Sequence, residues 1–168
     1  MSKIQAVRGV QRILSAEFVF NYNDWAIDSV SLVKTTFGST TALADPSSAV
    51  SGLTAGTAIT FDAIPMPLGA VIVGGEVIVE TAYVGIGAAA TLSLGIAGST
   101  TALVNAMDLD AAAAGSRTAL TLTAPLLCNA GQNIRLTTSG LTATATAGKV
   151  RVRVQYTIDG KMDEVVTV

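Results

Sequence analysis

Polar and apolar residues alternate without a break near the end of the chain, from Lys149 to Gln155. Because successive side chains of a β-strand point to opposite faces, this pattern predicts a strand over residues 148–158 with one apolar and one cationic face. The apolar face is predicted to hold Val150, Val152, Val154, Tyr156 and Ile158. The opposite face carries Lys149, Arg151, Arg153 and Gln155. A shift by one residue would bury the cations, so we expect a fixed register.

Shorter runs of the same kind recur along the chain. Residues 59–67 predict a strand that Pro65 and Pro67 end, because proline cannot donate to a ladder. Further strands are predicted over residues 30–37, 71–83, 91–96, 120–122, 134–138 and 165–168. In the longest of them a bulge is expected at Gly74–Gly75. Beyond that bulge we expect Val77, Val79, Thr81 and Tyr83 on one face and Glu76, Ile78 and Glu80 on the other.

The segments between these runs are rich in small and polar residues. Residues 38–60 predict an exposed loop or a pair of hairpin turns, and residues 109–114 predict one short helical turn ended by Gly115. Tight turns are expected at residues 129–131 and 159–160. About eight to ten short strands without a long helical period predict an all-β fold, an antiparallel β-sandwich that is jelly-roll-like.

Residues 1–28 differ from the rest and are treated as a separate region, with the sandwich domain over residues 29–168. This region holds half of the eight aromatic residues of the chain. They are Phe18, Phe20, Tyr22 and Trp25. The region reads either as a first strand of the sandwich or as an N-terminal arm that contacts a neighbouring subunit. Residues 4–14 could also form one side of a short helix, since their apolar positions are three or four apart.

Composition narrows the class of function. Charged residues make up 13% of the 168-residue chain, about half the usual share, so we expect part of the surface to be covered in an oligomer or assembly. The net charge of −2 gives no support for a nucleic-acid partner. The most apolar run, residues 68–79, is interrupted by glycines and Glu76 and is too short to predict a membrane helix. Charges also interrupt the only candidate signal peptide, so synthesis in a cytoplasm is expected.

Residues able to carry catalysis are scarce. Histidine is absent, which excludes Ser-His-Asp and Cys-His catalysis and His-based zinc sites. The single cysteine, Cys128, is expected to be a small buried hydrophobe. Asp108 and Asp110 lie in a polar loop with too few further oxygen ligands for a calcium site. We therefore expect no enzyme activity, no cofactor and no metal.

The cationic face of residues 148–158 has a plausible structural partner. Glu76 and Glu80 lie on one face of the other long predicted strand. Cross-strand pairs of opposite charge stabilise sheets, so we expect these glutamates, rather than an external anion, to meet Lys149, Arg151 and Arg153.

Three segments together resemble small structural proteins of tailed bacteriophages. The first runs from Phe61 to Ile72 and joins a Leu/Ile-Pro step to a Gly-Ala bend before a long Val/Glu strand. The other two are residues 91–95 and residues 147–156, so the likeness covers residues 59–158 and leaves the first 58 residues without a named match. In size and in its Ala/Thr/Gly-rich β composition the chain is most similar to head decoration, or cement, proteins.

This resemblance implies a virion protein that binds the major capsid protein and stabilises the outer surface of the head. It also implies a homo-oligomer, with a trimer favoured. Phe18, Phe20, Tyr22 and Trp25 would then be the intersubunit or capsid contact, because aromatic side chains supply large contact areas. A tail, neck or fibre component is the alternative, and a carbohydrate-binding sandwich is the third choice. Oligomer count, strand order and partner surface are not deducible from the sequence.

Overall fold

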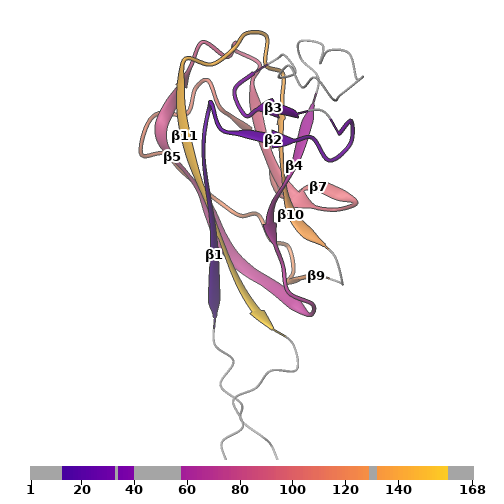
Figure 1. Cartoon of the computed structure of the whole chain (residues 1–168). Helices are drawn as coiled ribbons and strands as arrows, with labels where there is room; N and C mark the ends of the chain where they lie inside the picture. Colours follow the sequence, from indigo (N-terminus) through magenta and orange to yellow (C-terminus); the bar gives the residue numbers. More distant parts are fainter. Residues whose placement is uncertain (1–12, 33, 40–57, 129–131, 159–168) are drawn as a thin grey trace, which may run out of the picture.

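A computed structural model describes residues 13–32, 34–39, 58–128 and 132–158. These residues form antiparallel β-strands joined by turns (Figure 1). The strands are β1 (Leu14–Asn21), β2 (Trp25–Ile27), β3 (Lys34–Thr36), β4 (Ile59–Pro65), β5 (Ala70–Val84), β6 (Thr91–Ile96), β7 (Ser99–Asp108), β8 (Arg117–Ala119), β9 (Leu126–Cys128), β10 (Asn133–Ser139) and β11 (Ala147–Ile158). The all-β fold predicted from alternation is confirmed.

Two sheets pack against each other as a β-sandwich. The first has the order β1-β11-β5-β8, with β9 also paired to β5. The second has the order β4-β10-β6-β7, and β2 and β3 form a separate hairpin beside β4 (Figure 1). Strands β1 and β4 are therefore edge strands, one in each sheet. The jelly-roll description stays a prediction.

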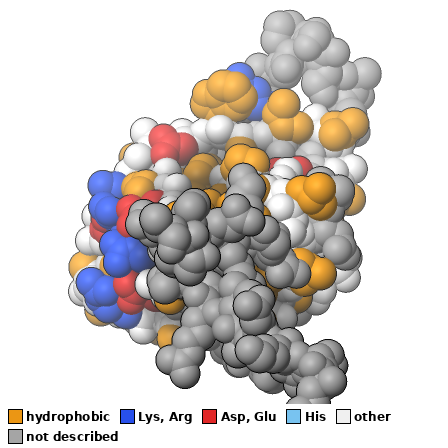
Figure 2. All heavy atoms as spheres, turned by 90° about the horizontal axis from the view of Figure 1, so that it is seen from below, with side chains coloured by type: hydrophobic (Ala, Val, Ile, Leu, Met, Phe, Trp, Pro, Cys, Tyr) orange, Lys and Arg blue, Asp and Glu red, His pale blue; other side chains and the backbone are white. Residues whose placement is uncertain are grey.

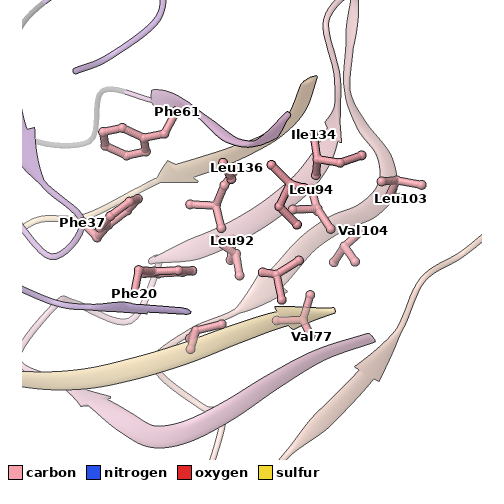
Figure 3. Packing of buried hydrophobic residues seen from close by; sticks show 14 of the residues in the cluster. Phe20, Phe37, Phe61, Val77, Leu92, Leu94, Leu103, Val104, Ile134 and Leu136 are labelled. Carbon is pink, nitrogen blue, oxygen red and sulfur yellow. The ribbon is translucent and has the colours of Figure 1, made fainter. Parts of the chain in front are cut away.

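Aliphatic side chains fill most of the space between the sheets, and phenylalanines fill one end of it (Figure 3). Phe20 comes from β1, Phe61 comes from β4, and Phe37 lies between them just after β3. The ring centroid of Phe37 is 4.5 Å from those of both Phe20 and Phe61. All three rings are fully buried or nearly so. Because Phe37 contacts one ring from each sheet, it joins the two sheets.

Strand β11 confirms the central prediction over most of its length. Val150, Val152 and Val154 are fully buried. Tyr156 is half-buried and packs against the same core, as predicted. The alternation of burial weakens after it, because Thr157 is buried and Ile158 is only half-buried.

Register shifts interrupt the pairing of strand β5 with β11. Val73 has no partner in the register with β11, which places the bulge directly before the predicted Gly74–Gly75. A second irregularity near Glu80 turns Thr81 outward, whereas Val77, Val79 and Tyr83 are buried as predicted. The predicted strands at residues 59–65, 91–96 and 134–138 are confirmed as β4, β6 and β10.

Other predictions were wrong. Of the predicted strand at residues 30–37, the described residues form only the short β3, because residues 28–31 form a turn. Residues 99–108, for which no strand was predicted, form β7, and residues 120–122 are not a strand. Residues 109–111 form a bend and residues 114–115 a turn, rather than a helical turn over residues 109–114. The predicted helix at 4–14 overlaps β1 at Leu14 and otherwise falls largely outside the described residues, as do the turns at 129–131 and 159–160, the strand at 165–168 and most of the 38–60 loop.

Candidate interaction surface

The four aromatic residues predicted as a contact surface divide into two groups. Phe18 and Phe20 lie on the inner face of β1, and Phe20 is fully buried. Tyr22 follows β1 and is half-buried against the core. Only Trp25 is exposed, on β2. Phe18 and Phe20 therefore contribute first to the core of their own sandwich, and a contact role for the four together stays a prediction.

Large exposed apolar side chains gather on the β2–β3 hairpin. The exposed fractions are 59% for Trp25, 54% for Ile27, 78% for Val30 and 71% for Leu32. Trp25 and Ile27 share one face of β2, while Ala26 between them packs against the core. We call these four exposed residues the hairpin tip. Apolar side chains concentrated in this way on one element are typical of interaction surfaces.

A buried carboxylate holds the hairpin tip in place. Asp28 is 2% exposed, and its Oδ2 accepts hydrogen bonds from the backbone N–H and the hydroxyl of Ser31. Its Oδ1 accepts the backbone N–H of Thr60 in β4, at 2.8 Å. Burial alone raises the pKa of Asp28, but the hydrogen bonds from Ser31 and Thr60 outweigh it, so the pKa lies below its ordinary value. The tip is therefore held to the sandwich by an ionised side chain.

Leu32 adopts a backbone conformation that is costly for a leucine. Its φ is 60°, in the left-handed region, and its backbone N–H donates to the carbonyl of Asp28. Left-handed backbone costs a residue with a Cβ about 1–2 kcal/mol. The side chain recovers little of this by burial because it projects into solvent. Strain of this kind at an exposed apolar residue suggests a binding role.

Trp25 also contacts a cation. The amine of Lys34 on β3 lies 3.8 Å from the centre of the indole ring. This cation–π contact orients the indole and places a positive charge beside the exposed apolar residues. The hairpin tip therefore combines fixed apolar contact area with one flanking charge.

The outer face of the first sheet carries a continuous ladder of ion pairs. Its members, in spatial order, are Arg117, Glu76, Arg153, Glu17, Arg151, Glu80 and Lys149. Charged side chains of both signs gather on one side of the face in Figure 2. The predicted pairing of Glu76 and Glu80 with the cations of β11 is confirmed.

Glu17 was not predicted as a member of this ladder. Its carboxylate accepts hydrogen bonds from Arg153 at 2.7 Å and Arg151 at 3.3 Å, and the Arg153 bond holds the pKa of Glu17 below its ordinary value. A hydrogen bond from Lys149 acts in the same direction on the pKa of Glu80. Its four cations and three carboxylates leave a net charge of +1, and every member is paired within the sheet.

The other candidate groups have structural environments. Cys128 is fully buried, and burial raises the pKa of its thiol, as expected for a small core residue. Asp108 accepts the backbone N–H groups of Asp110 and Ala111 and so caps a turn. Within the described ranges, no group of three or more potential ligands is placed to hold a metal ion. In the same ranges, no helix has the length and hydropathy needed to cross a bilayer.

A groove opens where the edges of the two sheets meet. Its volume is about 240 Å³, and it lies between β1 and β4 beneath β2. Its walls are mostly apolar, with two carboxylates. The lining residues are Phe18, Val19, Phe20, Asp24, Trp25, Ala26, Phe37, Phe61 and Asp62. The groove and the hairpin tip share Trp25, so they form adjoining parts of one surface.

The sequence pointed to Trp25 as a contact residue. It did not indicate the anchoring role of Asp28 or the exposure of Val30 and Leu32. One signal was available: Asp followed three residues later by Ser is typical of a side chain that caps its own turn. The positive φ of Leu32 had no signal, because leucine rarely adopts it.

No protein-family model matches the sequence, and no curated protein sequence matches it. Among solved structures, the chain is similar to a chain of the cyanophage Pam1 capsid asymmetric unit, with a TM-score of 0.57 and 18% sequence identity. The likeness covers 94% of this chain and 92% of that one. At this identity, it shows that the two chains share a fold.

Proposed function

We propose that the chain is a structural component of a bacteriophage virion, and specifically a decoration protein that binds the outer surface of the capsid and stabilises it. The whole-chain likeness to a chain of a cyanophage capsid carries this proposal. It extends over nearly the full length of both chains, so it concerns the complete sandwich rather than one common motif.

The physical character of the described residues supports the same role. The sandwich is held by a continuous core, its ion pairs are satisfied internally, and its described residues contain no group placed for metal chemistry. The most distinctive exposed feature is the hairpin tip, which Asp28 fixes to β4. Function by surface contact requires such a rigid apolar feature, because little conformational entropy is then lost on binding. In this proposal the hairpin tip contacts the major capsid protein, and the chain acts as an oligomer, with a trimer favoured.

Binding to capsids tests the proposal. Purified chain is mixed with capsids lacking it, and bound copies are counted by quantitative mass spectrometry relative to the major capsid protein. Val30→Ser removes apolar area from the hairpin tip, whereas Leu68→Ser removes a comparably exposed apolar side chain from the turn between β4 and β5. We expect saturable binding that Val30→Ser weakens about tenfold and Leu68→Ser leaves nearly unchanged.

The result that contradicts the proposal is absence of the chain from purified heads. Its recovery with separated tails would instead establish the alternative role, a tail, neck or fibre component. Equal weakening by both substitutions would retain the capsid role and remove the hairpin tip as the contact.

A further inference from the structure

Three of the four sheet edges in the described residues are protected against pairing with another strand. Strands β8 and β9 have three residues each. Strand β7 bulges at Asn105 and Ala106, which both lie opposite Ser93. On β4, the N–H and carbonyl of Thr60 are already bonded to Asp28 and Ser29. Short, bulged and covered edges are the usual devices by which sheets avoid edge-to-edge association.

The fourth edge, β1, is long, regular and free of proline. Its eight residues pair with β11 without a register shift. The N–H of Tyr22 points toward β11 and donates to Gly148, whereas the N–H of Asn21 points away and donates to Asp24. Because inward and outward backbone groups alternate along an antiparallel strand, Ser15, Glu17 and Val19 present their N–H and carbonyl groups outward. Strand β1 therefore offers an open ladder.

The groove lies beside this open ladder. Val19 belongs to both, and Phe18 and Phe20 on either side of it form one groove wall. A strand added to β1 would make backbone hydrogen bonds at Val19 and could insert an apolar side chain among the phenylalanines. Backbone bonds supply affinity in such strand addition, and a pocket for a side chain supplies specificity. Asp62 at the groove already pairs with Arg135 at 2.8 Å, whereas Asp24 accepts from the uncharged N–H groups of Asn21. Asp24 therefore favours a strand that carries a cation.

Residues 1–12 have this chemistry. They contain Lys3, Arg8 and Arg12 and no acidic residue, together with apolar positions such as Val7. Fully extended, they span roughly 40 Å, which exceeds the roughly 26 Å length of β1. The segment thus has the length and the charge to follow the open edge.

A segment returning along its own β1 would have to reverse direction first. Residues 10–13, Val-Gln-Arg-Ile, include none of the residue types that favour a tight turn. A reversal at Gly9 would bring Met1 beside about residue 17, so residues 1–8 would not extend to the groove beside Val19 and Trp25. The segment from a neighbouring copy needs no reversal.

We propose that the β1 edge and its groove bind residues 1–12 of a second copy of this chain as an added strand. Copies are thereby linked through exchanged N-terminal segments. This inference is independent of the virion role. Its surface adjoins the hairpin tip at Trp25 and does not include Ile27, Val30 or Leu32.

Zero-length cross-linking tests the proposal on the full chain. Copies labelled with ¹⁴N and ¹⁵N are mixed, allowed to exchange and treated with a carbodiimide, which joins amines to carboxylates in direct contact. We expect mixed-isotope cross-links from Lys3 or the N-terminal amine to Glu17, Asp24 or Asp62. Sedimentation velocity on the same samples should show oligomers.

Two substitutions at one position isolate the edge. Val19→Pro removes an outward N–H and adds a ring to the edge, yet keeps the bonds to β11, whereas Val19→Thr keeps the N–H and the β-branched shape. We expect Val19→Pro to reduce the mixed-isotope yield about tenfold and Val19→Thr to leave it nearly unchanged. Circular dichroism establishes that both variants fold. A monomer at every concentration, cross-links confined to single-isotope pairs, or an unchanged yield from Val19→Pro would each overturn the proposal.

Discussion

The backbone N–H of Thr60 donates a hydrogen bond of 2.8 Å to Oδ1 of Asp28, although the two residues are 32 positions apart. This bond joins the β2–β3 hairpin to the edge of the second sheet. Ser29 adds a second link, since its N–H donates to the carbonyl of Thr60 at 2.7 Å. Asp28 and Ser29 therefore both help to fix the position of the hairpin tip, together with the packing of Ala26 against the core.

Replacing that side chain should destabilise the protein. Asp28→Ala leaves the N–H groups of Thr60 and Ser31 without their acceptor, which we expect to lower the free energy of unfolding by about 3 kcal/mol. Urea denaturation followed by Trp25 fluorescence measures the change. Asp110→Ala, at an exposed carboxylate, is the matched control and should change stability by less than about 0.5 kcal/mol. Equal effects would mean that Asp28 does not hold the hairpin.

Stability should fall in acid through the same group. The pKa of Asp28 is lower in the folded chain than its ordinary value, so the folded state binds its proton less readily than the unfolded state. Its contribution is fully present above the unfolded pKa, about 3.9, and is lost as the pH falls through the folded pKa. The lowered pKa values of Glu17 and Glu80 act in the same direction.

We therefore expect urea midpoints that are level near neutral pH and decrease below about pH 4. The decrease should be shallower for Asp28→Ala than for the unmodified chain, because one of the contributing carboxyls is gone. An identical pH dependence in the two proteins would assign the acid sensitivity to the other carboxylates.

Alternation predicted the strands whose pairing is regular. Strand β10 alternates buried and half-buried residues along its whole length, and β6 and most of β11 were found by the same signal. The cross-strand ion pairs were predictable for a related reason: opposite charges lay on matching faces of two long strands.

Bulges account for most of the strand positions that alternation did not predict. In β7 the adjacent residues Leu103 and Val104 are both buried and Ala106 has a φ of 47°, so no period of two remains in the sequence. The role of Glu17 depended on the pairing of β1 with β11, a contact between the two ends of the domain that no local pattern encodes. Phe37 was likewise placed by tertiary contacts with both sheets.

A pair of proline substitutions should reveal which backbone groups of β1 face outward. Ala16→Pro removes an N–H directed at β11 and places its ring against that strand, so we expect a loss of about 3 kcal/mol or more. Ser15→Pro replaces an outward N–H and should cost less than about 1 kcal/mol. Urea denaturation compares the two. A greater loss from Ser15→Pro would reverse the assignment of the open edge.

Gly148 should tolerate no side chain, for a steric reason that can be separated from backbone strain. Its φ is 145°, and a Cβ there would lie 2.6 Å from the ring of Tyr83. Gly98 also has a positive φ, 87°, but no atom lies within 4 Å of its Cβ position. Gly98→Ala should therefore lose about 1 kcal/mol from strain alone, and Gly148→Ala about 3 kcal/mol from strain and overlap together. Equal losses in thermal unfolding would remove the Tyr83 contact as a cause.

Leu32 allows stability and binding to be changed in opposite directions. Glycine adopts a φ of 60° without steric cost, so Leu32→Gly should relieve strain, and a net gain of about 0.5–1 kcal/mol is expected after its greater freedom in the unfolded chain is counted. The same change removes an exposed apolar side chain from the hairpin tip, so we expect weaker binding to capsids by the assay described above. Leu68→Gly, at an exposed leucine outside the tip, should leave binding unchanged. A variant that is more stable yet binds less well would show that the strained leucine is kept for contact, because stability alone favours glycine at this position. Unchanged binding would place the contact elsewhere on the sandwich.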